Sequence, residues 1–179
     1  MPPFMVIKAG LSNRCEGIGV TVFGKAFCLE NVSPVPRVVW HQDFPLILGE
    51  DMTAFFRQAH GHGGIVVSTR CASPHPYHLM TERNGEVDFL FKVPQSIRGF
   101  RQNYPEVFSF VPALVYIPAG QAASRLADPR HFAPCMMAAD KLLDKTRLLD
   151  WLEIQSRLEE RGTAGECEAA SLAASCCGP

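Results

Sequence analysis

The sequence lacks features that would place it in several common functional classes. It has no run of about eighteen apolar residues, the length that a helix needs to cross a bilayer. The N-terminal residues Met1-Pro2-Pro3-Phe4 do not form a charged stretch followed by an apolar segment and a cleavage site. The formal net charge is −1, which gives no overall attraction for nucleic acid or an anionic membrane. We therefore expect an intracellular protein that binds neither.

Familiar catalytic motifs are absent as well. The chain has no Gly-x-Ser-x-Gly elbow, no Gly-x4-Gly-Lys phosphate loop and no His-Glu-x2-His pair. Cys71 with His75 or His78 provides a nucleophile and a base in principle, but no motif supplies an orienting group or an oxyanion hole. We predict a protein that is not an enzyme, and a small cysteine- or metal-dependent enzyme is the alternative.

The most informative stretch is rich in potential metal ligands. Four of the six histidines and one of the seven cysteines lie within residues 60–78, namely His60, His62, Cys71, His75 and His78. Imidazole and thiolate are the usual zinc ligands, and glycines and prolines nearby allow the backbone to bend. The spacing matches no standard zinc finger, and no Cys-x2-Cys occurs. We predict a structural zinc in this region; the alternative is a polar loop whose histidines face water, with Cys71 buried as a small hydrophobe.

The chain length of 179 residues suggests one domain. We predict an α+β domain over residues 1–161, in which a mixed or antiparallel sheet is packed by two helices, followed by a disordered tail over 162–179. The seven cysteines are expected to be mostly free thiols or metal ligands. Apolar runs and alternation predict strands at 4–8, 18–29 (one strand, or a hairpin broken near Gly24-Lys25), from 37, 65–67, 86–93 and 107–117. In the last of these, Pro112 indicates an edge position or a bulge.

Two helices follow from apolar spacing. Met52, Phe55, Phe56 and Ala59 predict a helix that opens at 49–51 and ends before the glycines after residue 60. Residues 136–161 predict a longer helix that ends at Gly162, with leucines on more than one face. Its own sheet and loops are expected to cover it, or else one face docks in a partner's groove. Three acids in or near it are interpreted as solvated helix-surface residues: Asp140, Asp144 and Asp150.

Four short blocks over residues 10–126 form a pattern when they are taken in order. They are Cys15-Glu16-Gly17-Ile18-Gly19-Val20-Thr21-Val22; Val38-Val39-Trp40 through Leu48 and the helix after it; His60-Gly61, Cys71-Ala72-Ser73-Pro74, Gly85-Glu86-Val87 and Phe91; and residues 105–110 followed by Val115, Gly120 and Arg125-Leu126. In this order they resemble the adenovirus early region 4 34 kDa protein family, of which the chain looks like a short, divergent member.

The resemblance implies an early viral regulatory adaptor. Such a protein joins a viral early protein to the host elongin B/C and cullin module, so that selected host proteins are ubiquitinated. The family recruits elongin through a box of leucine, three residues, cysteine and an apolar residue beyond. Here Leu11 and Cys15, followed by Ile18 and Val20, fit that spacing as the candidate partner-binding residues. A turn whose leucine packs inward is the alternative.

The chain also departs from the family's pattern. It keeps few of the family's metal-binding cysteines, so His62, His75 and His78 would have to substitute as ligands. Its predicted C-terminal helix is mixed in charge rather than arginine-rich, and no basic nuclear-import cluster is present. From the family and the small size we expect the host nucleus and cytoplasm. A host-protein-binding module without ligase recruitment remains the alternative function.

Overall fold

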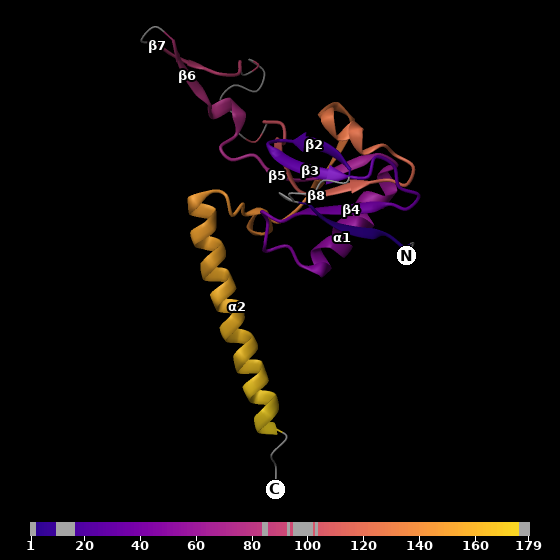
Figure 1. Ribbon diagram of the computed structural model, residues 1–179. Helices are drawn as coiled ribbons and strands as arrows, with labels where there is room; N and C mark the ends of the chain where they lie inside the picture. Colours follow the sequence, from indigo (N-terminus) through magenta and orange to yellow (C-terminus); the bar gives the residue numbers. More distant parts are fainter. Residues whose placement is uncertain are drawn as a thin grey trace.

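The computed structural model describes residues 3–9, 17–83, 86–92, 94, 102 and 104–175, and it confirms the α+β class. Its centre is a mixed five-stranded sheet in the order β1-β4-β8-β5-β9 (Figure 1). The β1–β4 and β5–β9 pairs are parallel, and β8 is antiparallel to both of its neighbours. The strands are β1 (Met5–Ala9), β4 (Arg37–His41), β5 (Ile65–Cys71), β8 (Phe108–Ile117) and β9 (Phe132–Met136).

Each face of this sheet has its own apolar layer. On one face lies the hairpin of β2 (Ile18–Val22) and β3 (Lys25–Leu29), so of the two alternatives for residues 18–29 the hairpin is correct and the single long strand is wrong. On the other lies helix α1 (Gly49–Ala59), which buries Phe55, Phe56 and Ala59 (Figure 1). The three–four spacing therefore predicts the buried face of the helix correctly. In the hairpin, Val20 and Val22 of β2 and Phe27 and Leu29 of β3 face the core, a change of parity across the turn that one continuous alternation does not predict. A separate ribbon of β6 (Met80–Arg83) and β7 (Glu86–Phe89) extends from the body.

The turn of the β2–β3 hairpin is held by an aromatic contact. Phe23 and Gly24 have φ values of 46° and 81°, the left-handed conformation that both central residues of a type I′ turn adopt. This conformation is unfavourable for phenylalanine. The Phe23 ring stacks on that of Phe110, with centroids 5.4 Å apart, and meets Phe132 edge-on at 6.2 Å. The stacking offsets the backbone strain and fixes the hairpin on the sheet.

Strand β8 contains a bulge, as Pro112 indicated, but it occupies the centre of the sheet rather than an edge. Val67 pairs with Val115 and Thr69 with Phe110, so Ser68 alone lies opposite residues 111–114. The Ser68 hydroxyl donates to the carbonyl of Val111 and accepts from the Leu114 N–H at 2.9 Å. A proline is tolerated here because the bulge removes the need for its missing N–H.

The prediction of a helix over residues 136–161 is wrong in its start and its end. Strand β9 occupies residues up to Met136, a 3₁₀ turn η7 (Ala139–Leu142) follows, and helix α2 runs over Leu148–Ser175. The helix passes through Gly162 and continues into the segment for which we expected disorder. Glycine lowers helix stability by only about 1 kcal/mol, so one glycine does not end a helix without a further stop signal. None of the described helices combines the length and apolarity needed to cross a membrane.

The described cysteines differ in their state. Cys28, in β3, is disulfide-bonded. Cys71 and Cys135 are free, the first exposed and the second buried. Cys135 donates to the side-chain oxygen of Gln58 on α1 at 3.1 Å, which helps to join β9 to that helix.

We predict that Ser68→Ala destabilises the protein by about 2 kcal/mol, because the partly buried Val111 carbonyl and the buried Leu114 N–H would lose their partner. Urea unfolding followed by tryptophan fluorescence measures the change. Ser124→Ala, at an exposed position, is the control and should leave the midpoint unchanged. Equal midpoints for Ser68→Ala and the wild type would show that the bulge does not depend on this hydroxyl.

Candidate functional site

The five predicted zinc ligands fall into two groups at opposite ends of β5. His60 and His62 form the 3₁₀ turn η1 (His60–His62) before the strand, whereas Cys71 ends it. His75 and His78 lie beyond, at the turn η2 (Pro76–His78). A seven-residue strand spans roughly 20 Å at about 3.3 Å per residue, so the two groups do not share one ion.

His60 has a structural contact of its own. Its Nδ1 lies 3.2 Å from the hydroxyl of Tyr116, and its ring stacks on Phe56 with centroids 5.2 Å apart. Tyr116 is buried in β8, and burial raises the pKa of its hydroxyl. His60 therefore links the end of α1 to the central strand, while His62 is exposed.

At the other end of β5, both ring nitrogens of His75 are engaged. Nδ1 accepts from the N–H of Tyr77 at 3.2 Å, and Nε2 donates to the carbonyl of Pro105 at 3.1 Å. In the part of the chain that the structure describes, no three histidine, cysteine or acidic side chains converge as a metal site. A zinc ion here stays a prediction, which metal analysis of the purified protein tests; binding it would require His75 to exchange a hydrogen bond.

The structure describes two of the four residues of the predicted elongin box. Leu11 and Cys15 lie outside the described residues, so their arrangement is not described. Ile18 is half-buried, and Val20, 8% exposed, belongs to the core beneath the β2–β3 hairpin. The assignment of Val20 as a partner contact is therefore corrected: in a strand that alternates between core and solvent, it faces inward.

A different apolar surface is exposed at the start of α2. Leu148, Leu149 and Leu152 are 73%, 78% and 55% exposed, and their i, i+1, i+4 spacing puts them on one side of the helix. We call these three residues the leucine patch. The opposite side carries Ile154, which is fully buried against Leu46 and Leu143. The helix is thus docked by one side and presents leucines on the other.

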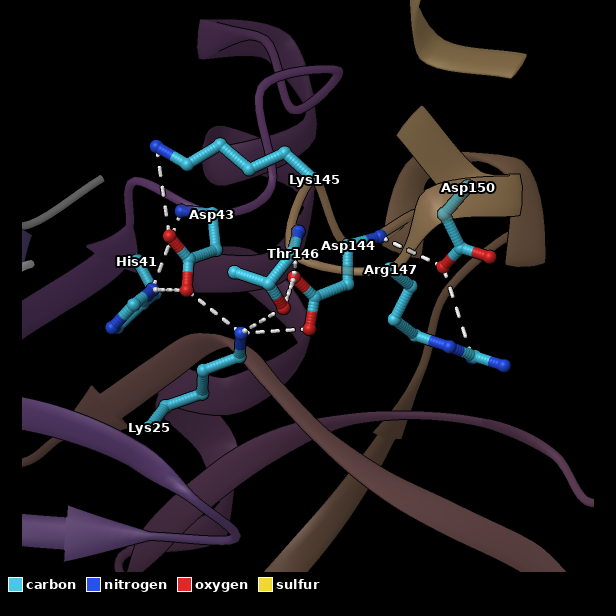
Figure 2. Close-up of polar contacts among 8 residues, drawn as sticks. All are labelled: Lys25, His41, Asp43, Asp144, Lys145, Thr146, Arg147 and Asp150. Atoms are coloured by element: carbon cyan, nitrogen blue, oxygen red, sulfur yellow. Dashed lines mark hydrogen bonds and ion pairs between the residues drawn. The ribbon is translucent and has the colours of Figure 1, made fainter. Parts of the chain in front are cut away.

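A largely buried ionic cluster fixes the segment before α2 to the body of the protein. The ammonium of Lys25, in β3, lies 2.7 Å from carboxylate oxygens of both Asp43 and Asp144. Figure 2 shows the two carboxylates pointing at Lys25 from different segments of the chain. The backbone N–H of Lys145 donates to the Asp43 carbonyl at 2.9 Å, and Thr146 donates to Asp144 through its hydroxyl and its N–H. Three segments distant in sequence therefore meet at one charge.

The cluster extends to the first turn of α2. Asp150 accepts from the backbone N–H of Asp144 at 3.0 Å and lies 3.7 Å from the guanidinium of Arg147 (Figure 2). Asp144 and Asp150 are thus largely buried and paired, not the solvated surface acids that we expected. The sequence carried no signal for this, because the pairing of Lys25 with Asp144 joins residues far apart in the chain.

Burial and charge shift the pKa values of the cluster. Burial lowers the pKa of Lys25, but hydrogen bonds to Asp144 and Asp43 outweigh it and raise the pKa above 10.5. Burial raises the pKa of Asp144, but the hydrogen bonds from Lys25 and Thr146 bring it below 3.8. Burial lowers the pKa of the neighbouring His41, whose Nδ1 accepts from the N–H of Asp43 at 3.3 Å. The pair is therefore charged and His41 neutral at neutral pH.

Comparisons with known proteins add no relative. No protein-family model matches the chain, and no curated protein is similar to it. The function therefore has to be inferred from the residues and their arrangement.

We predict that the ion cluster contributes to stability only between acid and alkaline limits. Because the folded pKa of Asp144 is depressed, its contribution is complete above about pH 4 and is lost as the pH falls through that folded pKa. Because the folded pKa of Lys25 is raised, its contribution is complete below about pH 10 and is lost as the pH rises further.

Asp144→Asn should reduce the free energy of unfolding by about 1–2 kcal/mol at neutral pH, since it leaves a largely buried ammonium with one carboxylate fewer. The difference from the wild type should shrink in acid, because the protonated Asp144 side chain is then neutral, as the asparagine side chain is. Thermal unfolding over a pH series measures this. Asp128→Asn, which breaks an ion pair with the exposed Arg130, is the control and should have little effect. A constant difference at every pH would contradict the role of the Asp144 charge.

Proposed function

We propose that the protein is an adaptor that acts by docking another protein on the leucine patch of α2, without chemistry of its own. The observation that carries this proposal is the exposure of Leu148, Leu149 and Leu152 on a helix whose other side is already buried. Fully burying a leucine contributes about 1.5–3 kcal/mol, so three of them on one side make a sizeable contribution to binding. An amphipathic helix laid in an apolar groove is a common mode of recognition.

The ionic cluster supports this proposal because it orders the helix before a partner binds. Lys25 ties the Asp144 turn to the hairpin, and Arg157 of α2 pairs with Asp140 at 3.0 Å. A helix that is already held in place loses less conformational freedom on binding than a free peptide. The leucine patch is thus presented on a rigid support rather than on a loose tail.

The resemblance to the adenoviral early region 4 34 kDa family supports a particular class of partner. We propose that α2 docks host elongin B/C, which joins a cullin and a viral early protein in a complex that ubiquitinates host proteins, in the nucleus and cytoplasm. Because Val20 packs in the core, the box at residues 11–20 is a weaker candidate for this contact than the sequence alone indicated. The leucine patch supplies exposed apolar residues that such a groove requires.

We predict that Leu149→Glu with Leu152→Glu reduces co-purification of elongin B/C by about 100-fold, because two carboxylates cannot be buried in an apolar groove without a large free-energy penalty. A pull-down from infected or transfected cells, quantified by mass spectrometry, measures this. The control is Ser156→Glu, which adds a carboxylate at an exposed position of the same helix.

The outcomes separate the proposals. Loss of elongin B/C in the double variant and retention in the control support docking through the leucine patch. Loss with Leu11→Ser and Cys15→Ala instead would assign the contact to the first box. A different host protein that depends on the leucine patch, with no elongin present, would support a binding module without ligase recruitment.

A cysteine-dependent enzyme is the second candidate, and one observation favours it. Cys71, His75 and His78 line the same cavity. Among the described residues, however, Cys71 makes no hydrogen bond to either histidine, and both nitrogens of His75 are engaged. We expect His78→Ala to leave the rate of Cys71 alkylation by iodoacetamide unchanged at neutral pH. A marked decrease, measured by mass spectrometry, would show that a histidine activates the thiol and would favour catalysis.

A further inference from the structure

A cavity of about 540 Å³ lies beside the end of β5, and the adaptor function makes no use of it. Its volume is in the range of sites that hold small molecules, roughly 300–1,000 Å³. Side chains from three strands and from two loops line it, including Cys71, His75, His78, Tyr104, Phe108 and Met136. It shares none of its lining residues with the leucine patch.

One wall of the cavity is an uncovered part of the sheet. The register pairs Cys71 with Phe108 and Thr69 with both Phe110 and Met136, which puts all of them on the face that the β2–β3 hairpin covers elsewhere. The hairpin ends at Phe23, which contacts Phe110. Beyond it, Phe108 and Met136 are 42% and 48% exposed. The core of the sheet therefore continues into an open apolar wall.

The other wall is aromatic and braced from behind. The ring of His75 lies 5.0 Å from those of both Tyr77 and Tyr104, and His78 lies 5.8 Å from Tyr104. Hydrogen bonds from His75 Nε2 to the Pro105 carbonyl and from the Ala72 N–H to the Val107 carbonyl join the two loops at 3.1 Å and 2.9 Å. This wall is thus formed before any ligand arrives, which reduces the loss of entropy on binding.

The charge of the lining limits what the cavity can hold. Of the described residues that line it, Glu106 carries the carboxylate, and none is a lysine or an arginine. Nothing there offers a phosphate or a carboxylate ligand a fixed positive charge, and Glu106 repels both. Flat rings, by contrast, match the aromatic and apolar walls, where they stack on tyrosine and histidine and contact methionine sulfur.

From this geometry we propose that the cavity between the sheet face and the His75–Tyr104 wall binds a flat aromatic molecule that carries no negative charge. Phe108 and Met136 contact one side of its rings, and His78 and Tyr104 the other. Cys71 lies at the same cavity, so its thiol reports occupancy. The proposal is independent of docking at α2.

Two dyes with the same ring skeleton test it on the full chain. N-phenyl-1-naphthylamine is neutral, whereas 1-anilinonaphthalene-8-sulfonate carries a sulfonate group with one negative charge. The neutral dye should bind saturably at one site and should slow alkylation of Cys71 by iodoacetamide, measured by mass spectrometry of the Cys71 peptide. The sulfonate should bind about five-fold more weakly because of Glu106, and Glu106→Gln should narrow that difference.

Variants locate the binding site. Met136→Glu puts a carboxylate in the apolar wall at an exposed position, and it should weaken binding of the neutral dye by at least about ten-fold. Leu149→Glu, the same change in the leucine patch, should leave dye binding unchanged. Circular dichroism confirms that each variant is folded, and protection of Cys71 in the wild type tests the site without any substitution.

Three results would overturn the proposal. They are a neutral dye that neither saturates nor protects Cys71, equal affinity for both dyes in the wild type, and unchanged binding by Met136→Glu. Loss of dye binding in Leu149→Glu alone, a fourth such result, would place the dye on α2 instead.

Discussion

The bulge in β8 shifts the pairing between β5 and β8 by an odd number of residues. This shift determines which side chains of β8 reach each face of the sheet. Ser68 lies opposite residues 111–114, so Phe108 and Phe110 face the same way as Val115 and Ile117 despite their opposite parity. Without the bulge, strand alternation would turn both phenylalanines toward the α1 face. The stack of Phe23 on Phe110 and the apolar wall of the cavity both depend on this shift, and the buried Ser68 hydroxyl holds it through Val111 and Leu114.

The second determinant is the charge of Lys25. Its ammonium brings together the hairpin, the turn after β4 and the segment before α2, and two carboxylates compensate its burial. A largely buried ion pair is a modest source of net stability but a demanding constraint on geometry, because an unpaired charge there is costly. Together with Ile154, it fixes how α2 leaves the body, and so fixes which side of the helix presents the leucine patch.

These two constraints give the protein two apolar surfaces of different kinds. The leucine patch is convex, lies on a helix and suits the groove of a protein. The cavity is concave, has aromatic walls and suits a flat small molecule. Each has a rigid support built from contacts elsewhere in the chain, as recognition surfaces with low entropic penalties require. A scaffold that presents two such surfaces is consistent with the proposed adaptor role.

By itself the sequence determined the local elements. Apolar patterning indicated residues 18–29 as one strand or a hairpin, three–four spacing defined α1, and Pro112 indicated an edge position or a bulge, because these signals depend on neighbours within a few residues. It did not determine β9, where a proline at position 134 masks an edge strand, or the start of α2, which follows the Asp144 turn. The sequence grouped His60 and Cys71 as candidate zinc ligands, although β5 separates them. It also indicated Val20 as a partner contact, although Val20 is buried in the core. Only the tertiary structure decided these points, since the pairing of Lys25 with Asp144 and of Phe108 with Cys71 joins residues that no local pattern connects.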